Sequence, residues 1–481
     1  MPEAVERKEL EDLQEDLREV QALLRRQKLV EGLVERQERM ANRELVEQLV
    51  HKQHLAELGR KLEGMHPADI AYILEALPLD DRLAVWELVK AERDGEILLE
   101  VSDAVRETLI RDMDSHELLA AAEHLDADEI ADLAPDLPED VLQGVFRSLP
   151  VEEREELRAA MSYPEDSVGA LMDFEEISVR EDVTLEVVTR YLRRFEELPD
   201  HTDQVFVVDR DEQLKGVLPI SKLVVTDLDA LVRDAMLTEY VALYPDDKAQ
   251  DAAQAFERYD LVSAAVISPR GKLLGRVTVN AVVDFIRARS EAQQLAKGGL
   301  RETEDVFAPV WQSVKNRWTW LGINMITAFI ASRVIGLFEG SIEKLVALAA
   351  LMPIVAGIGG NAGNQTITMI VRALALGQVS DEQSRQLLRK ELSVAVVNGL
   401  IWGGVLGLAA YWLYGSAPLG MVMTAAMMLN LLLAALAGVL IPVVRMRLGF
   451  DPALGSAVMI TAFTDSGGFL IFLGLATIFL L

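Results

Sequence analysis

The sequence predicts a multidomain α-helical membrane protein, in which an acidic cytoplasmic half precedes five transmembrane helices. Three observations lead to this prediction. The formal net charge is −30 at pH 7, and the excess of acidic residues lies entirely before Trp311. The chain after Trp318 is hydrophobic in five blocks, each close to or above the ~20 residues that cross a bilayer. The soluble half changes near residue 169 from helical periodicity to a tandem α/β repeat.

The composition also excludes several classes of site and partner. The chain has no cysteine, which excludes disulfides, thiolate metal sites and cysteine nucleophiles. An acidic soluble half repels nucleic acid, so no nucleic-acid partner is expected, whereas metal cations are attracted. The sequence has no P-loop, nucleophile elbow or His–carboxylate cluster, and no enzymatic activity is expected.

Residues 1–65 are predicted to form a helical extension. Leu10, Leu13, Leu17, Val20 and Leu24 step by three and four, which is the seam of a short coiled coil. Two interpretations stay open at this point. The seam binds a partner chain, or the amphipathic helix packs on its own domain.

Residues 66–168 are predicted to form an acidic domain of short helices stacked as a superhelix. Prolines that end or begin a helix interrupt the pattern at Pro67, Pro78, Pro135, Pro138 and Pro150. A Leu-Pro pair followed by acidic residues recurs along this region, as in a small helical array. Glu96 lies on an early helix, and Asp128 and Asp132 share one face of a later helix.

Residues 169–232 and 233–290 each contain a strand–turn–strand unit flanked by helices. The strands are expected at 205–209 and 214–218, and again at 264–268 and 273–277. This repeat resembles a pair of CBS domains, a regulatory module that often binds adenosine nucleotides. Nucleotide-binding copies usually carry Ser/Thr-x-x-Asp after the second strand, whereas Pro219–Lys222 and Thr278–Ala281 occupy these positions here. Because neither run has the aspartate that holds the ribose, nucleotide binding is not expected.

Residues 283–312 are predicted to form a connecting helix and linker, and residues 313–481 the transmembrane domain. Its hydrophobic blocks are 318–338, 345–376, 392–414, 419–444 and 453–481. Basic residues gather before the first block, between the second and third, and between the fourth and fifth. The positive-inside rule therefore places the N-terminus in the cytoplasm and the C-terminus outside.

The second block contains an unusual polar run. It holds a proline, four glycines and the carboxamides of Asn361, Asn364 and Gln365. Broken helices and polar side chains are tolerated in a bilayer only where they face protein or water. We interpret the run as a glycine-broken, pore-lining helix, in which an ion or a backbone can come close to three glycines: Gly357, Gly360 and Gly363. A close helix–helix contact of small residues is the alternative.

Asp465 is the only carboxylate between Pro452 and the C-terminus. A charge near the middle of a bilayer costs a few kcal/mol, so such a residue usually faces a cavity on an ion path. The last block holds no Lys, Arg or His, and Thr461 lies one turn before Asp465. Together with the amides, these oxygen ligands suit Mg²⁺, Ca²⁺ or Mn²⁺ rather than Zn²⁺ or Cu⁺.

The polar run, the later Asp451-Pro452-Ala453-Leu454 and Thr464-Asp465 resemble the MgtE family of magnesium channels, as does the domain order over residues 66–481. The resemblance implies a homodimeric, Mg²⁺-selective channel that takes up magnesium across the inner membrane, with Asp465 of both chains binding hydrated Mg²⁺. It implies that intracellular Mg²⁺ on the cytoplasmic domains closes the pore. The implied regulatory ligands are Glu96, Asp128, Asp132, Asp260, Asp284 and Asp451.

Three positions depart from the family pattern, because Ala281, Arg289 and Ala292 stand where acidic ligands are expected. Fewer bridging metals would weaken closure by Mg²⁺, and Arg289 could replace a metal with a direct ion pair. Two other functions stay open. One is a secondary transporter that exchanges a divalent cation for Na⁺ or H⁺, and the other is a membrane-anchored CBS sensor that acts on a partner through the N-terminal helices.

Overall fold

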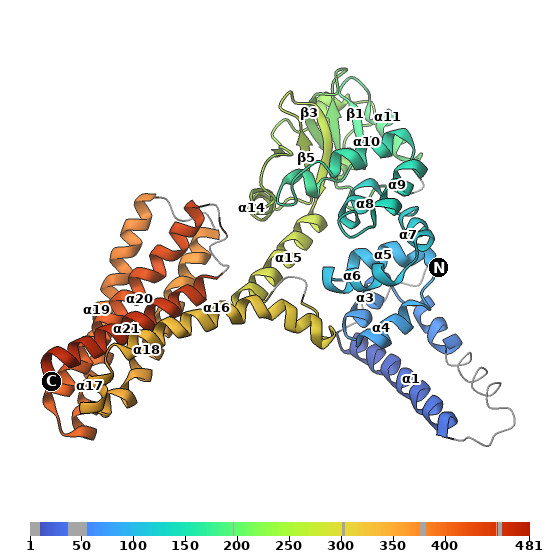
Figure 1. Cartoon of the computed structure of the whole chain (residues 1–481). Helices are drawn as coiled ribbons and strands as arrows, with labels where there is room; N and C mark the ends of the chain where they lie inside the picture. Colours follow the sequence, from blue (N-terminus) through green and yellow to red (C-terminus); the bar gives the residue numbers. More distant parts are fainter. Residues whose placement is uncertain are drawn as a thin grey trace. The chain divides into compact units, whose positions relative to one another are not determined.

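The computed structural model describes residues 10–36, 55–195, 197–300, 304–375, 381–448, 450 and 455–481. The chain divides into two compact units, each drawn in Figure 1. The N-terminal unit runs to Arg289 and includes Asp305–Pro309. The C-terminal unit comprises Ser290–Glu304 and Val310–Leu481.

Helix α1 (Leu10–Arg36) packs on its own domain, which favours the second interpretation of the predicted seam. Val20 and Leu24 are buried in the core that Leu58 and Leu62 help to form. Lys61 forms ion pairs with two carboxylates of the helix, one of them Asp16 at 2.9 Å. Residues 1–9 and 37–54 of the predicted extension lie outside the described residues.

Short helices then build the predicted helical array. They are α3 (Pro67–Glu75), α4 (Leu79–Trp86), α5 (Asp94–Glu100), α6 (Asp103–Asp112), α7 (Ser115–Ala122), α8 (Ala127–Leu133), α9 (Glu139–Ser148) and α10 (Val151–Ala160). Proline begins α3 and stands just before α4, α9 and α10. Asp114 and Asp126 start α7 and α8 with capping boxes, in which the side chain and a glutamate satisfy free backbone N–H groups. The inward faces of these helices share one hydrophobic core.

The α/β region contains two three-stranded sheets of the same topology. The first comprises β1 (Ser178–Arg180), β2 (Gln204–Val208) and β3 (Leu214–Pro219), with helices α11 (Leu185–Leu192), α12 (Ile220–Val225) and α13 (Val232–Ala235). The second comprises β4 (Ala242–Leu243), β5 (Ser263–Ile267) and β6 (Leu273–Thr278), with α14 (Ala249–Tyr259) and α15 (Val279–Lys297). In each sheet the first pair is parallel and the second antiparallel. The predicted strands of both copies are confirmed.

The segment that opens each copy packs on the sheet of the other copy. Asp173 exchanges backbone hydrogen bonds with Arg276 of β6, and Leu237 does so with Val217 of β3. A Cβ on Gly275 would lie 2.6 Å from the carbonyl oxygen of Asp173, so this approach requires glycine. The two sequence copies therefore form one interlocked body.

The C-terminal unit is a bundle of long helices. They are α16 (Val310–Gly336), α18 (Ala347–Ala375), α19 (Asp381–Tyr414), α20 (Ala417–Arg447) and α21 (Ser456–Leu480), with the short α17 (Glu339–Lys344) before α18. Among the described residues, α16, α20, α21 and residues 385–414 of α19 are long and apolar enough to cross a membrane. Helix α18 has 29 residues, but its polar run lowers its hydrophobicity. The five predicted blocks match five long helices, and the crossing of α18 stays a prediction.

Helix α20 is the centre of the bundle and the most buried of the four apolar helices. It packs against α18, α19 and α21, and Figure 1 shows it beside α19 and α21. Gly399, Gly403 and Gly407 of α19 allow close contact, since a Cβ on each would lie within 3 Å of an α20 atom. Such small-residue contacts hold helices together in a bilayer.

The predicted break in the second hydrophobic block is wrong. Helix α18 is continuous through its four glycines, and Pro353 lies inside it. A proline inside a helix removes one backbone hydrogen bond, which neighbouring helices in a membrane bundle can offset. The unusual property of this segment is therefore its polar face and not an interruption of the backbone.

Candidate ion pathway and regulatory carboxylates

Helix α18 carries a polar face that its own bundle does not cover. Asn361, Asn364, Gln365 and Thr368 are spaced by three and four residues, and all are exposed. Amide groups that contact lipid tails would be strongly unfavourable. In a bilayer this face must therefore lie against water or another protein surface.

Asp465 lies on α21, the helix that packs beside α18. Its side chain is partly exposed, and Thr461 is exposed one turn earlier on the same face. In the described part of the chain, its carboxylate makes no hydrogen bond or ion pair. Thr464 next to it turns inward and is fully buried, 3.7 Å from the Cβ position of Gly360. The carboxylate is thus free to bind an ion that approaches this face.

The glycines of α18 have different roles. A Cβ on Gly363 would lie 2.4 Å from the Ile460 side chain, so this residue allows α18 to pack on α21. Gly357 has open space around its Cβ position. For Gly363 the structure supports the alternative of a small-residue contact, whereas the exposed amides lie on the other side of α18.

Sequence reasoning missed Asn430, which lies at the crossing of three helices. It is fully buried on α20, and its Nδ2 donates a hydrogen bond of 2.8 Å to the carbonyl oxygen of Val355 on α18. Gly359 and Gly468 make room for it, since a Cβ on either would lie within 3 Å of Nδ2. Its Oδ1 has no hydrogen-bond partner among the described residues. The signal in the sequence was a single amide side chain within the apolar block 419–444.

A second missed residue is Glu391, near the start of α19. Its side chain is buried, and Oε2 accepts a hydrogen bond of 3.2 Å from Oγ1 of Thr366 on α18. Lys390 Nζ lies 3.8 Å from its other oxygen. A buried carboxylate needs such partners, so Glu391 joins α19 to the inward face of α18. The signal in the sequence was an acidic residue directly before a hydrophobic block.

Several carboxyl groups of the N-terminal unit are buried near other acidic residues. Burial, together with the nearby Asp173, raises the pKa of Asp128 to about 8. Asp173 itself is held by Arg276, whose Nε and Nη2 lie 2.8 and 2.7 Å from Oδ2. Burial and the same aspartate raise the pKa of Glu176 to about 7. These raised pKa values favour protonated carboxyls, and a cation bound at the junction of α8 with the segment around Asp173 would replace the protons and stabilise the charged form.

Of the predicted regulatory ligands, the structure places Asp132 near Asp284. Burial raises the pKa of Asp132 to about 6, Arg106 opposes this rise, and the charge of Asp284 adds to it. Burial raises the pKa of Glu129 on α8, and the charge of Glu96 adds to this rise. Asp260 caps α14 in a left-handed conformation and does not contribute to the raised pKa of Asp128, Asp132 or Asp284.

These carboxylates do not assemble into a finished metal site. Within the described ranges, no three Asp, Glu or His side chains are placed to hold one ion. Asp451 lies outside the described residues. The regulatory set therefore stays a prediction, supported by pairs of carboxylates that lie on different elements.

Arg289 forms the ion pair that the sequence suggested. Its Nη1 lies 3.0 Å from Oδ1 of Asp166, which connects the helical array to the α/β body. The pair is exposed, and such pairs contribute between 0 and about 1 kcal/mol. A basic residue thus makes a weak direct contact where an acidic metal ligand was expected.

A bundle that is otherwise apolar but presents only oxygen ligands on an uncovered face suits a hard cation. The fold and the site are therefore those of a membrane protein whose uncovered polar face suits a hard divalent cation.

Comparison with known proteins names the family. Residues 352–475 match the MgtE family of divalent cation transporters, residues 65–166 the MgtE intracellular N domain, and residues 232–288 the CBS domain. The chain is 31% identical to the magnesium transporter MgtE of Thermus thermophilus over 428 residues, which cover 87% of this chain and 94% of the relative. It is 25% identical to the magnesium transporter MgtE of Bacillus subtilis over 421 residues, or 87% and 93% of the two chains.

A solved structure titled as the cytosolic domain of the Mg²⁺ channel MgtE in complex with ATP is also similar, with a TM-score of 0.45 and 28% identity. It covers 50% of this chain and 97% of that chain. The chain belongs to the MgtE family of magnesium transporters. The predicted family, the intracellular helical domain, the CBS pair and the apolar helices are thereby confirmed. Mg²⁺ is the ion that this family transports, and the family is not a class of enzymes.

Proposed function

We propose that the chain forms a homodimeric Mg²⁺-selective channel of the inner membrane, closed by intracellular Mg²⁺. The ion path runs along α18 and α21 of both copies, with the N-terminus in the cytoplasm and the C-terminus outside. The observation that carries this proposal is the Asp465 carboxylate, which has no partner among the described residues and lies on the helix that packs beside α18 and its uncovered amide face. A nucleotide is not part of the proposal, because the ribose-binding aspartate is missing from both CBS copies.

The exposed polar face is the argument for a dimer. A second copy related by a two-fold axis would cover Asn361, Asn364 and Gln365 and enclose water between the two faces. The axis would also bring a second Asp465 to the path. Mg²⁺ gives up its water reluctantly and is usually held through that water by one or two carboxylates. Two aspartates and a ring of amides match this requirement.

The crowded carboxylates of the N-terminal unit support closure by Mg²⁺. The charge of Asp173, on a different element, adds to the raised pKa of the buried Asp128, and the charge of Asp284 on α15 adds to that of the buried Asp132 on α8. A divalent cation between such pairs removes the repulsion and draws the elements together, whereas its loss lets them separate. Because Ala281 and Ala292 offer no ligand and Arg289 carries the opposite charge, fewer ions bridge these elements than a fully acidic set would bind.

Growth of a bacterium that lacks its own Mg²⁺ uptake tests this function. The wild-type chain should restore growth on low Mg²⁺, and Asp465→Ala should abolish it. Glu339→Gln, a carboxylate of α17 outside the proposed path, is the matched control and should grow like wild type. Full growth of Asp465→Ala would instead support the membrane-anchored sensor and contradict an ion path at this residue.

A further inference from the structure

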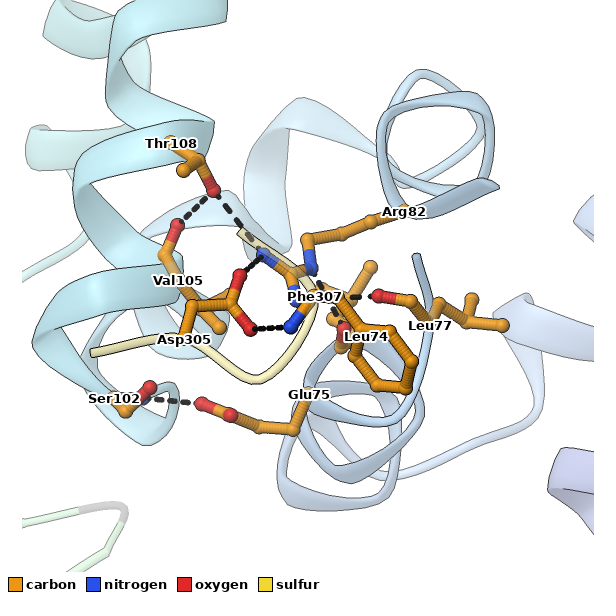
Figure 2. Close-up of polar contacts among 9 residues, drawn as sticks. All are labelled: Leu74, Glu75, Leu77, Arg82, Ser102, Val105, Thr108, Asp305 and Phe307. Carbon is orange, nitrogen blue, oxygen red and sulfur yellow. Dashed lines mark hydrogen bonds and ion pairs between the residues drawn. The ribbon is translucent and has the colours of Figure 1, made fainter. Parts of the chain in front are cut away.

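A charged side chain lies at the centre of the helical array, where its burial would be costly alone. Arg82 of α4 is completely buried. Its Nε donates to the carbonyl oxygen of Leu74 at 2.8 Å and its Nη2 to that of Leu77 at 3.2 Å. Figure 2 shows the guanidinium also pointing at Thr108 and at a carboxylate, that of Asp305.

The carboxylate comes from a distant part of the sequence. Oδ2 of Asp305 lies 2.8 Å from Nη1 of Arg82, and the side chain of Asp305 is 6% exposed. Its other oxygen accepts a hydrogen bond of 2.8 Å from the backbone N–H of Phe307, which folds the segment into a turn (Figure 2). Removing one member of a buried charge pair leaves the other uncompensated, which is strongly unfavourable. The helical array is therefore incomplete without Asp305–Pro309.

The residues on either side of this segment belong to the C-terminal unit. Helix α16 starts at Val310, directly after Pro309. Glu304, directly before Asp305, accepts hydrogen bonds from Nδ2 of Asn316 at 2.9 Å and from Nη2 of Arg317 at 3.0 Å, both on α16. The two adjacent carboxylates thus contact different units. Glu304 contacts the first turns of α16, and Asp305 contacts the helical array.

We propose that Arg82 and Asp305 are positioning residues that fasten the start of α16 to the helical array. Asp305–Pro309 can extend to at most about 18 Å, so a larger displacement of the array must pull α16 or break the pair. A change in the array is thereby transmitted to the first membrane helix by a connection separate from α15. This inference rests on the proposed closure by intracellular Mg²⁺, and it adds the connection that carries the signal.

The test measures two properties of the full-length protein, with Mg²⁺ itself as the probe. Mg²⁺ flux into proteoliposomes is recorded against the Mg²⁺ concentration on the side of the N-terminal unit, and hydrogen exchange is followed at residues 305–309. Asp305→Ala should raise the inhibitory Mg²⁺ concentration about 10-fold or more without lowering the flux in low Mg²⁺. Exchange at 305–309 should rise about 100-fold, the factor that corresponds to loss of a buried pair.

Arg93→Met is the matched control, because Arg93 also donates to backbone carbonyls of the helical array, those of Leu62 and Met65. It should leave exchange at 305–309 and the inhibitory Mg²⁺ concentration unchanged. Asp305→Asn keeps the shape and an acceptor oxygen and should give intermediate shifts. If Asp305→Ala does not fold, the shift in Asp305→Asn decides.

The outcomes separate the two proposals. Wild-type inhibition by Mg²⁺ in both Asp305 variants would overturn the positioning role, even with faster exchange at 305–309. Unchanged exchange would show that the buried pair does not hold the segment and would overturn the inference as well. A wild-type protein that conducts Mg²⁺ but is not inhibited by it would contradict the proposed closure. The exchange measurement would then still show whether the Arg82–Asp305 pair holds residues 305–309 on the helical array.

Discussion

Asp465 of the C-terminal unit and the carboxyl groups of α8 in the N-terminal unit lie in different surroundings. In the C-terminal unit, Asp465 stands alone on a helix face without a partner among the described residues. In the N-terminal unit, burial raises the pKa values of Asp128 and Asp132, and the charges of Asp173 and Asp284 add to this rise. A lone carboxylate can bind and release a passing hydrated ion, whereas crowded carboxylates store repulsion that a bound ion relieves. Under the proposed function, the same residue type would serve transport in one unit and sensing in the other.

The largest effects are expected from substitutions on the two faces of α18, one uncovered and the other packed against α21. Asn364→Leu removes an amide from the uncovered face and should lower Mg²⁺ flux about 10-fold or more while leaving thermal stability near wild type. Gly363→Val places side-chain atoms against Ile460 and should destabilise the folded protein by about 1–3 kcal/mol. Flux per folded protein and the melting temperature in detergent measure the two effects. If Asn364→Leu were unstable and Gly363→Val were inactive but stable, Asn364 would be the packing residue and Gly363 would belong to the ion path, which would contradict our assignment.

A smaller effect is expected from pH in the absence of Mg²⁺. The pKa of Asp128 rises from 3.8 to about 8 in the folded protein, so the native state binds more protons than the unfolded state. Stability from this group is complete below about pH 4 and is lost as pH rises through about 8. The melting temperature of the N-terminal unit in the full-length protein should therefore fall between these values.

Two comparisons sharpen this pH experiment. Asp128→Asn should reduce the slope of the profile because it removes one of the titrating groups, and saturating Mg²⁺ should restore stability at the alkaline end. Asp112, an acidic residue of α6 in the same helical array, gives the control variant Asp112→Asn, which should keep the wild-type slope. A melting temperature that rises with pH would contradict the raised pKa of the buried Asp128 carboxyl.

The smallest effect is expected at Arg289. Its exposed pair with Asp166 contributes at most about 1 kcal/mol, so Arg289→Ala should change the inhibitory Mg²⁺ concentration by less than about 5-fold. Arg289→Glu restores an acidic group at this position and should tighten closure by Mg²⁺ relative to Arg289→Ala. Flux inhibition curves compare the variants. Equal curves for alanine and glutamate would show that this position binds no ion.

The features that the sequence predicted are those set by local pattern. Hydrophobic length located the five long helices, turn spacing located the strands of both α/β copies, and spacing by three and four placed Asn361, Asn364 and Gln365 on one face. Prolines marked the starts of the short helices. The break expected at Pro353 was wrong, because a continuous helix tolerates proline where packed neighbours support it.

The features that the sequence could not provide depend on tertiary packing. Arg82 and Asp305 are separated by 223 residues, and neither lies in a motif. Asp173 reaches β6 only because the opening segments exchange between the copies. The structural roles of Asn430 and Glu391 follow from their hydrogen bonds to α18. Each of these depends on which elements meet, and no local pattern contains that information.

The most direct test of the account uses purified protein in liposomes with no Na⁺ or H⁺ gradient. A membrane potential alone, negative on the side of the N-terminal unit, should drive Mg²⁺ into the compartment on that side through the wild-type chain. Asp465→Asn, which keeps the side-chain shape but removes the charge, should carry no measurable current. Flux that needs an Na⁺ or H⁺ gradient would identify an exchanger, and wild-type current through Asp465→Asn would contradict the central role of this carboxylate.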